Sequence, residues 1–301
     1  MSNISIAGYA AISKLDAEET AALTRVLNTP ELLRQAEFIA ESVFIPQEPA
    51  PMPQLPESPK LSQAWFAAAF LGAEASRKHF EKCGFPEAVW RDTLTDLPVW
   101  LRNEKRNAGV TGLGPLAREW EVILYHGGVT RHGRLECNSE YFFKQESLRD
   151  SKGNIILAEG DPLINLHIPE DGPMKIADCG ESMRRMADFF DRYRQDFKWK
   201  GFVCQSWLLD RQLCNMLPAS SNIVKFQKLG VKYFIAETQS TLFRIFGNTP
   251  PDKVVNPSTL QRNAAEFLRN GGKFCSEGIY ISRSSAESVD YDLEKLIGRF
   301  Q

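Results

Sequence analysis

The chain has 301 residues, of which 43% are hydrophobic and 25% charged, an ordinary composition for a globular protein with enough chain for two domains. Its net charge of -2 gives no electrostatic reason to expect a nucleic acid or an anionic membrane as a partner. The six cysteines form no CxxC pair and have no histidine at metal-ligand spacing, so we expect free thiols and no metal site. No apolar run suits a signal peptide or a membrane span, and we expect a cytoplasmic protein.

Residues 1–126 predict a helical N-terminal domain. Asp16 can cap a helix through Leu27, and Pro30 suits the first turn of the next. Prolines over 46–59 then break the chain into an extended connector, which is either a strap within the chain or a ligand for an SH3-type partner. The predicted helices run over 16–27, over 30–44, from 61 onward, over 85–101 and over 116–125.

From residue 127 onward the pattern changes, and we expect an α/β domain over 127–301. The polar turn at 150–153 and Gly-Asp-Pro at 160–162 separate short segments of strand character. The expected antiparallel meander has strands over 131–137, 141–148 and 154–159.

A parallel crossover is predicted to follow this meander. Residues 163–168 alternate, with Asn165 and His167 on a polar face, as in a half-buried strand. Apolar residues at spacings of three and four over 176–197 predict a helix of about six turns that lies on a sheet. The apolar run 202–209 predicts a central strand buried on both faces. Strand, helix and strand in this order form a right-handed parallel unit.

The C-terminal part is predicted to complete the sheet and add helices. Asp210 is placed to cap a helix that starts at Arg211, and Ser220 or Ser221 to cap a helix through Leu229. The remaining expected elements are a strand pair over 232–238 and 242–246, a helix over 258–270, a short strand over 278–282 and a helix over 291–300.

Several short motifs follow one another in order across residues 95–282. They are Gly-Arg-Leu-Glu at 133–136, Gly-Asp-Pro at 160–162, Leu-His-Ile-Pro at 166–169, Gly-Pro at 172–173, Cys-Gln-Ser-Trp-Leu-Leu-Asp at 204–210, Leu-Pro at 217–218, Ser-Asn-Ile at 221–223, Phe-Gln at 226–227, Ser-Thr-Leu-Gln-Arg at 258–262 and Gly-Gly at 271–272. Together with the meander and crossover, this set resembles a bacterial family of acyltransferases in which a helical N-terminal domain precedes a GNAT-like C-terminal domain. The family tends to carry His where this chain has Gln205.

The resemblance implies an acyl-CoA-dependent acyltransferase with acetyl-CoA or another acyl-CoA as co-substrate, no metal, and an amine or other small nucleophile as acceptor. In GNAT enzymes the pantetheine arm enters between two splayed parallel strands, and the pyrophosphate rests on backbone amides where the next helix begins. Carried over to this chain, that donor site comprises Ile168, Gly172, Met174, Cys204, Trp207, Ser221 and Asn222.

The loop before that helix departs from the usual phosphate-binding pattern. Gly172 alone can approach a phosphate closely, Pro173 offers no amide, and Glu170 and Asp171 would repel a diphosphate. Two acids that stabilise a helix N-terminus explain the same loop equally well.

The implied chemistry needs a base and an acid, and His167, Gln205 and Ser206 are the candidate catalytic residues. His167 has a suitable ordinary pKa near 6.5, although a satisfied core histidine fits the same pattern. Gln205 and Ser206 can bind an acyl carbonyl or order a water, or bond to the splayed backbone instead. Tyr233 and Tyr280 are candidate acids, because the helix that commonly supplies a tyrosine in GNAT enzymes has none here.

Three functions are therefore open: an acyltransferase, a catalytically silent GNAT-like module that binds a small molecule or regulates, and a thiol hydrolase. The third would use Cys204 as nucleophile with His167 as base. A cysteine in a buried strand is, however, usually a small hydrophobic residue. The sequence makes no prediction about the oligomeric state.

Overall fold

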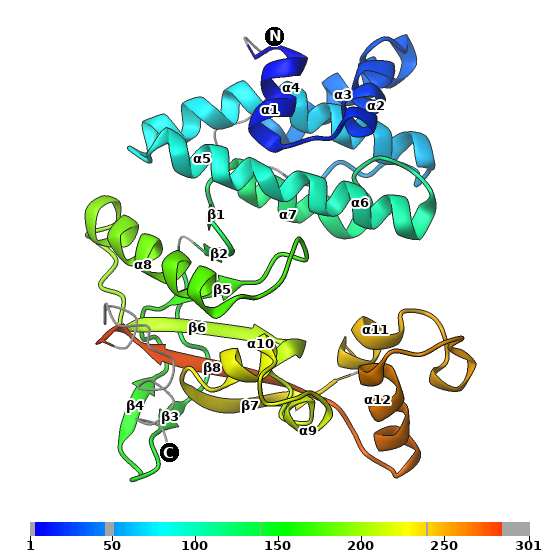
Figure 1. Cartoon of the computed structure of the whole chain (residues 1–301). Helices are drawn as coiled ribbons and strands as arrows, with labels where there is room; N and C mark the ends of the chain where they lie inside the picture. The colour runs from blue at the N-terminus through cyan, green and yellow to red at the C-terminus, as the bar shows by residue number, and fades with distance from the viewer. Residues whose placement is uncertain (1–3, 46–50, 139, 239, 285–301) are drawn as a thin grey trace. The chain divides into compact units, whose positions relative to one another are not determined.

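The computed structural model describes residues 4–45, 51–138, 140–238 and 240–284 (Figure 1). The chain forms two compact units, one of Met1–Ser139 with Ile168–Asp171 and one of Glu140–His167 with Gly172–Gln301. The border that the sequence suggests between residues 126 and 127 remains a prediction of domain organisation.

The first unit is helical, as predicted. Asp16 and Glu19 form a capping box at the second helix, and Pro30 lies in the first turn of the third. The expected helix over 85–101 is wrong as one element: a 3-10 turn over Leu94–Asp96 divides it, because Pro98 supplies no amide to a preceding turn. The helices are α1 (Ile6–Ser13), α2 (Ala17–Leu27), α3 (Pro30–Ile39) with a π turn (Ala40–Phe44), α4 (Pro59–Lys82), α5 (Glu87–Thr93), α6 (Leu97–Ala108) and α7 (Pro115–Tyr125).

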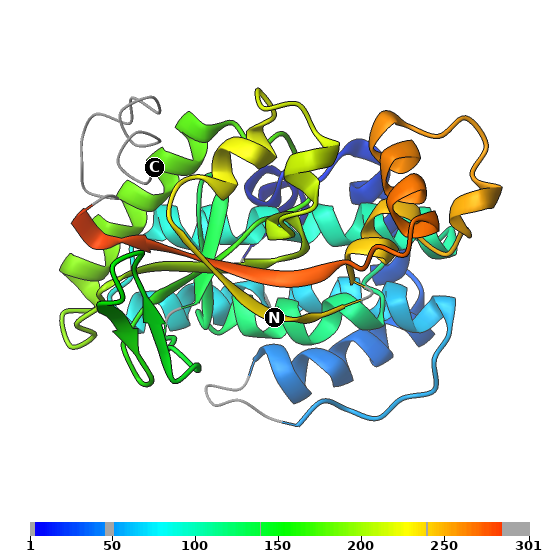
Figure 2. The same cartoon turned by 90° about the horizontal axis from the view of Figure 1, so that it is seen from below.

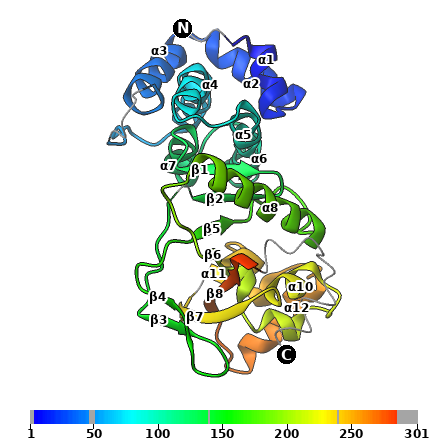
Figure 3. The ribbon, with the colours of Figure 1, turned by 90° about the vertical axis from the view of Figure 1, so that its left-hand side faces the viewer.

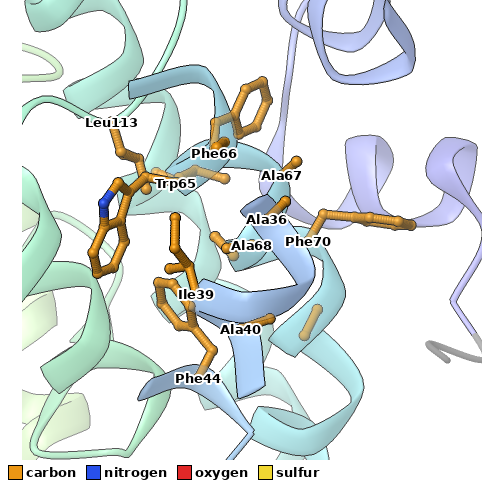
Figure 4. Close-up of a cluster of buried hydrophobic side chains, with 14 of the residues drawn as sticks. Ala36, Ile39, Ala40, Phe44, Trp65, Phe66, Ala67, Ala68, Phe70 and Leu113 are labelled. Carbon is orange, nitrogen blue, oxygen red and sulfur yellow. The ribbon is translucent and has the colours of Figure 1, made fainter. Parts of the chain in front are cut away.

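The core of the helical unit is built around α4 (Figure 4). Small residues on α4 let α3 and the π turn approach closely, and a Cβ added to Gly72 would lie 2.4 Å from the Cβ of Phe44. Phe44 packs edge-to-face on Trp65, with ring centroids 5.9 Å apart. These contacts explain why α4 must be alanine-rich on this face.

The connector behaves as a strap within the chain over the part that is described, residues 51–58. It forms neither helix nor strand. Met52 and Leu55 pack against the helical core, and the carboxylate of Glu57 accepts hydrogen bonds from the guanidinium of Arg118 at 2.5 and 3.0 Å. These contacts favour an intramolecular role over a ligand for another protein.

The expected three-strand meander is only partly correct. The segment 131–137 is not one strand but the hairpin of β1 (Val129–His132) and β2 (Leu135–Asn138), which turns at Gly133 with a φ of 84°. Of the segment 141–148, Phe142 forms a single bridge to Pro162, and only β3 (Ser147–Arg149) is a strand. β3 pairs with β4 (Ile155–Ala158) in a separate hairpin of the second unit (Figure 3).

The second unit contains the predicted parallel crossover. β5 (Ile164–His167) and β6 (Gly201–Ser206) pair in parallel, and α8 (Ile176–Tyr193) connects them. β8 (Cys275–Ser282), the red strand in Figure 2, then pairs antiparallel with both β6 and β7 (Val231–Glu237), so the strand order in this unit is β5-β6-β8-β7 (Figure 1).

One predicted strand pair is wrong. Residues 242–246 belong to α11 (Ser240–Phe246), and the partner of β7 is β8. Leu242, Ile245 and Phe246 recur at helical spacing and pack together with neighbouring helices. The other helices are α9 (Leu213–Met216), α10 (Asn222–Gln227) and α12 (Thr259–Arg269), and the expected helix over 291–300 lies outside the described residues.

Candidate functional site

The two parallel strands of the second unit part at their C-terminal ends. Their last pair is Leu166 with Cys204, whereas β6 continues to Ser206 in its pairing with β8. His167 and Gln205 are therefore the first residues beyond the last pair. Because side chains alternate along a strand and paired residues point the same way, His167 and Gln205 share one face of the sheet. The structure thus brings two of the three predicted catalytic residues to one place.

His167 is partly buried in this position. Its Nε2 lies 3.4 Å from the Nδ2 of Asn165, which precedes it by two residues on the same face. Burial lowers the pKa of the His167 imidazole to about 4. The ring is therefore neutral near pH 7 and able to accept a proton, though as a weaker base than an exposed histidine.

Gln205 holds two tyrosines. Its Nε2 donates to the hydroxyl of Tyr141 at 3.1 Å and to the hydroxyl of Tyr233 at 3.3 Å. Burial raises the pKa of Tyr233 to about 12 and also raises the pKa of Tyr141. The sequence predicts Tyr233 only as a candidate acid and gives no sign of Tyr141, whose segment has the pattern of a strand.

Ser206 has a structural task. Its Oγ accepts a hydrogen bond of 3.2 Å from the backbone amide of Leu208 and so caps the 3-10 turn Trp207–Leu209. The strand 202–209 therefore ends three residues earlier than predicted. Trp207 is partly buried against the hydrophobic cluster formed with α9, α11 and α12. Alternation places Ser206 on the face opposite Gln205.

Cys204 does not meet His167. Its side chain is buried on the opposite face of the sheet. Burial raises the pKa of its thiol to about 12, and the nearby Cys179 contributes in the same direction. A thiol of this kind is protonated near pH 7 and is a poor nucleophile. The geometry therefore argues against the thiol hydrolase.

The acids of the 169–174 loop are neutralised within the helical unit. Glu170 pairs with Arg106 at 3.0 Å, and Asp171 pairs with Arg131 and, at 3.4 Å, with Arg134. The expectation that both acids repel a diphosphate is thereby weakened, because each carboxylate faces at least one guanidinium.

The remaining predicted donor-site residues occupy ordinary positions. Ile168 is partly buried and Met174 is buried, while a Cβ on Gly172 would meet nothing within 4 Å. No side chain caps α8, which begins at Ile176. Ser221 caps α10 through the amide of Ile223 at 3.3 Å, and Asn222 is the first helical residue. These positions stay predictions for the donor site.

A buried polar network fixes the turn after β6, and the sequence did not reveal it. The Asp210 carboxylate accepts from the amides of Gln212 at 2.9 Å and Cys275 at 2.7 Å, so it joins the turn before α9 to the first residue of β8. The helix itself begins at Leu213, with Gln212 and not Asp210 at its N-cap. The amide nitrogen of Gln227 donates to the carbonyls of Leu208 at 2.7 Å and Asp210 at 3.0 Å.

Neither a metal site nor a membrane-spanning helix is found within the described ranges. For the metal, the search covered groups of three or more histidine, cysteine, aspartate or glutamate side chains.

Two family models match successive parts of the chain. Residues 4–127 match the N-acyltransferase N-terminal domain, and residues 129–280 match the GNAT-like C-terminal domain. Among curated proteins, none matches the chain. A solved acyltransferase in complex with decanoyl-CoA and teicoplanin superposes with a TM-score of 0.67 at 21% identity, over 91% of this chain and 86% of that chain. An acyltransferase with CoA and 10C-teicoplanin gives 0.68 over the same shares of both chains, again at 21% identity. These likenesses confirm the α/β fold, and the matched domains show that the chain belongs to the GNAT-like N-acyltransferase family.

Proposed function

We propose that the protein is an acyl-CoA-dependent acyltransferase that transfers an acyl group to an amine or another small nucleophile. The observation that carries this proposal is the separation of β5 and β6 after Leu166 and Cys204. Beyond that pair, the edge of β6 at Gln205 and Ser206 has no β5 partner, and amides of a pantetheine arm can pair with such an edge.

The proposed donor is acetyl-CoA or a longer acyl-CoA, because the solved relatives carry decanoyl-CoA or CoA. It would extend along Ile168, Gly172 and Met174 on one side and Cys204 and Trp207 on the other. Ser221 and Asn222 complete the proposed site. The proposed acceptor is a small molecule, because a solved relative is in complex with teicoplanin. The net charge of -2 gives no reason to expect a nucleic acid as acceptor. We place the reaction in the cytoplasm.

In the proposed reaction the acceptor nitrogen bonds to the thioester carbon and the carbon–sulfur bond breaks. The electron pair goes to sulfur, and the proton lost by the amine ends on the thiol of CoA. Neutral His167 can accept that proton directly or through a water, since burial keeps its pKa near 4 and the ring uncharged.

A second candidate function is a catalytically silent module that binds an acyl-CoA or a related small molecule. Gln205 favours it, because an amide cannot take up a proton near pH 7 as a histidine at this position can. The two functions share the binding site and differ only in turnover.

A turnover assay distinguishes the acyltransferase from the binding module. The purified protein is mixed with acetyl-, octanoyl- or decanoyl-CoA and a panel of amines, and free thiol and acylated acceptor are measured together. Thiol release that requires an amine and matches product formation supports the enzyme. Tight acyl-CoA binding with no product from any amine would favour the binding module.

A further inference from the structure

Tyr141, Gln205 and Tyr233 form one hydrogen-bonded cluster on the face that also carries His167. Tyr141 lies outside any strand, Gln205 lies on β6 and Tyr233 on β7. Tyr233 belongs to a buried cluster with Leu148 and Leu157, so the β3–β4 hairpin shields its side of the sheet. The cluster therefore combines strand-end placement with partial protection from water.

The hydrogen-bond directions leave both hydroxyl protons available. The amide nitrogen of Gln205 has two N–H groups, and it gives one to each phenol oxygen. Within the described chain, neither hydroxyl donates a hydrogen bond to a protein acceptor. Each O–H can therefore donate to a ligand without losing its bond from Gln205.

The phenols are suited to donate hydrogen bonds and poorly suited to give up protons. The pKa of Tyr233 is about 12, whereas a free thiol has a pKa of about 8.5. Full transfer of the Tyr233 proton to a departing thiolate is thus strongly uphill. A fixed O–H dipole, in contrast, stabilises developing negative charge without changing its protonation state.

We propose that Tyr141 and Tyr233 are paired hydrogen-bond donors that stabilise the negative charge developing on the thioester during acyl transfer, with Gln205 as the positioning residue that aims them. This inference rests on the proposed acyltransferase function and adds two catalytic residues to it. Charge builds first on the carbonyl oxygen as the acceptor nitrogen bonds to carbon. It then passes to sulfur as the carbon–sulfur bond breaks, and the proton from the amine neutralises the thiolate.

β8 is built to allow this arrangement. Gln205 and Tyr233 both lie opposite Gly278, each on its own side of β8. A Cβ at Gly278 would lie 2.2 Å from Cζ of Tyr233 and 2.5 Å from its hydroxyl oxygen. The phenol ring of Tyr233 therefore lies over Gly278, and its hydroxyl reaches Gln205 on the other side of β8.

The test compares Tyr233→Phe, Tyr141→Phe and the double variant with Tyr280→Phe as the matched control. Tyr280, which the sequence also offers as a candidate acid, belongs to the same buried cluster, but its hydroxyl donates to the carbonyl of Lys200 at 3.3 Å, so the structure removes it from the candidate catalytic residues. We expect kcat to fall about 100-fold in the Tyr233 variant and further in the double variant, while the Kd for acyl-CoA stays unchanged. Tyr280→Phe should retain wild-type kcat.

Gln205→Leu tests the positioning role. We expect a lower kcat with an unchanged Kd, and an upward shift of the phenol titration followed by absorbance, because the Gln205 bond lowers the pKa of Tyr233. A double tyrosine variant with wild-type kcat would overturn this inference while leaving the acyltransferase intact. Wild-type protein that binds acyl-CoA without turnover would overturn the acyltransferase itself and this inference with it.

Discussion

Gln205 donates a 3.3 Å hydrogen bond to the hydroxyl of Tyr233, although their strands, β6 and β7, do not pair with each other. β8 lies between the two strands, and Gly278 is the residue opposite both. An absent side chain on one strand thus permits a contact between its two neighbours.

Gly278→Ala should disrupt this contact. The new methyl would lie 2.2 Å from Cζ of Tyr233, so the ring must move away from Gln205. We expect kcat to fall at least 10-fold and the free energy of unfolding to drop by about 1–3 kcal/mol from overpacking. Urea denaturation and steady-state kinetics measure the two effects.

Gly172→Ala is the stability control for that variant, because its added methyl meets nothing within 4 Å. Its unfolding free energy should match the wild type. Equal stability and kcat in Gly278→Ala and wild type would contradict the role given to this glycine.

His167 should make the protein less stable in mild acid. Burial lowers the pKa of His167 to about 4 in the folded chain. Between about pH 6.5 and pH 4 the unfolded chain therefore binds a proton on this histidine and the folded chain does not. Stability is then complete above pH 6.5 and is lost as the pH falls toward 4, by up to about 3 kcal/mol. Urea unfolding of wild type and His167→Gln across this range should show a flatter curve for the variant. Parallel curves would mean that His167 is solvated.

Glu121 should have the opposite effect in the helical unit. Burial, then the charge of Asp96, raises the pKa of Glu121 well above its ordinary value. Glu136 and Asp96 share a hydrogen bond nearby, with Arg131 as the adjacent cation. A folded state that keeps a proton on Glu121 loses stability as the pH rises above the unfolded value near 4.5.

Glu121→Gln should therefore be more stable than wild type at pH 8 and similar to it at pH 4. Unfolding free energies from urea titrations at the two pH values measure this difference. Tyr9 and Tyr125, whose hydroxyls lie 2.6 Å apart beside this cluster, stay protonated throughout that range because burial raises the pKa of both. If Glu121→Gln were less stable than wild type at pH 8, that result would contradict a folded state that keeps a proton on Glu121.

Glu277→Gln should weaken the support beneath the turn after β6. The Glu277 carboxylate is fully buried on β8 and pairs with Arg211 and, at 2.9 Å, with Lys232. Removing its charge leaves both cations without a carboxylate, and we expect a loss of about 2 kcal/mol in unfolding free energy. Glu237→Gln is the control, since its pair with Lys273 at 3.1 Å is exposed and contributes little. Equal losses of unfolding free energy in Glu277→Gln and Glu237→Gln would contradict the difference expected between a buried and an exposed ion pair.

The sequence predicted the elements whose signal is local. Most helices of the first unit, the α8 crossover and strands β5 and β6 have clear apolar periods and recognisable caps or turns. The exceptions are α1, which was not predicted, and α5 and α6, which were predicted as one helix. Alternation along each strand made His167 and Gln205 candidate site residues, and their catalytic roles stay predictions. That the two share one face follows only from the register of the parallel pair in the structure. The long-range partner of β7 was not predicted, since 242–246 and 275–282 are both short apolar runs.

The site features that the sequence missed depend on contacts across the sheet. Nothing in the segment around Tyr141 indicates that its hydroxyl meets Gln205, 64 positions later. From the sequence alone Glu277 has the character of an exposed strand residue. The structure shows instead that it pairs with Arg211 and Lys232. The sequence likewise does not show why a glycine with an extended backbone, such as Gly278, must lack a side chain. The reason is the Tyr233 ring that lies against it in the folded sheet.

The most direct test of the account is calorimetric titration of the purified protein with acetyl-, octanoyl- and decanoyl-CoA, with free CoA as the control. We predict micromolar binding whose strength depends on the acyl group, because the thioester would lie beside Gln205 where β5 and β6 separate. Absence of binding with every acyl-CoA would contradict the central claim that this protein uses acyl-CoA.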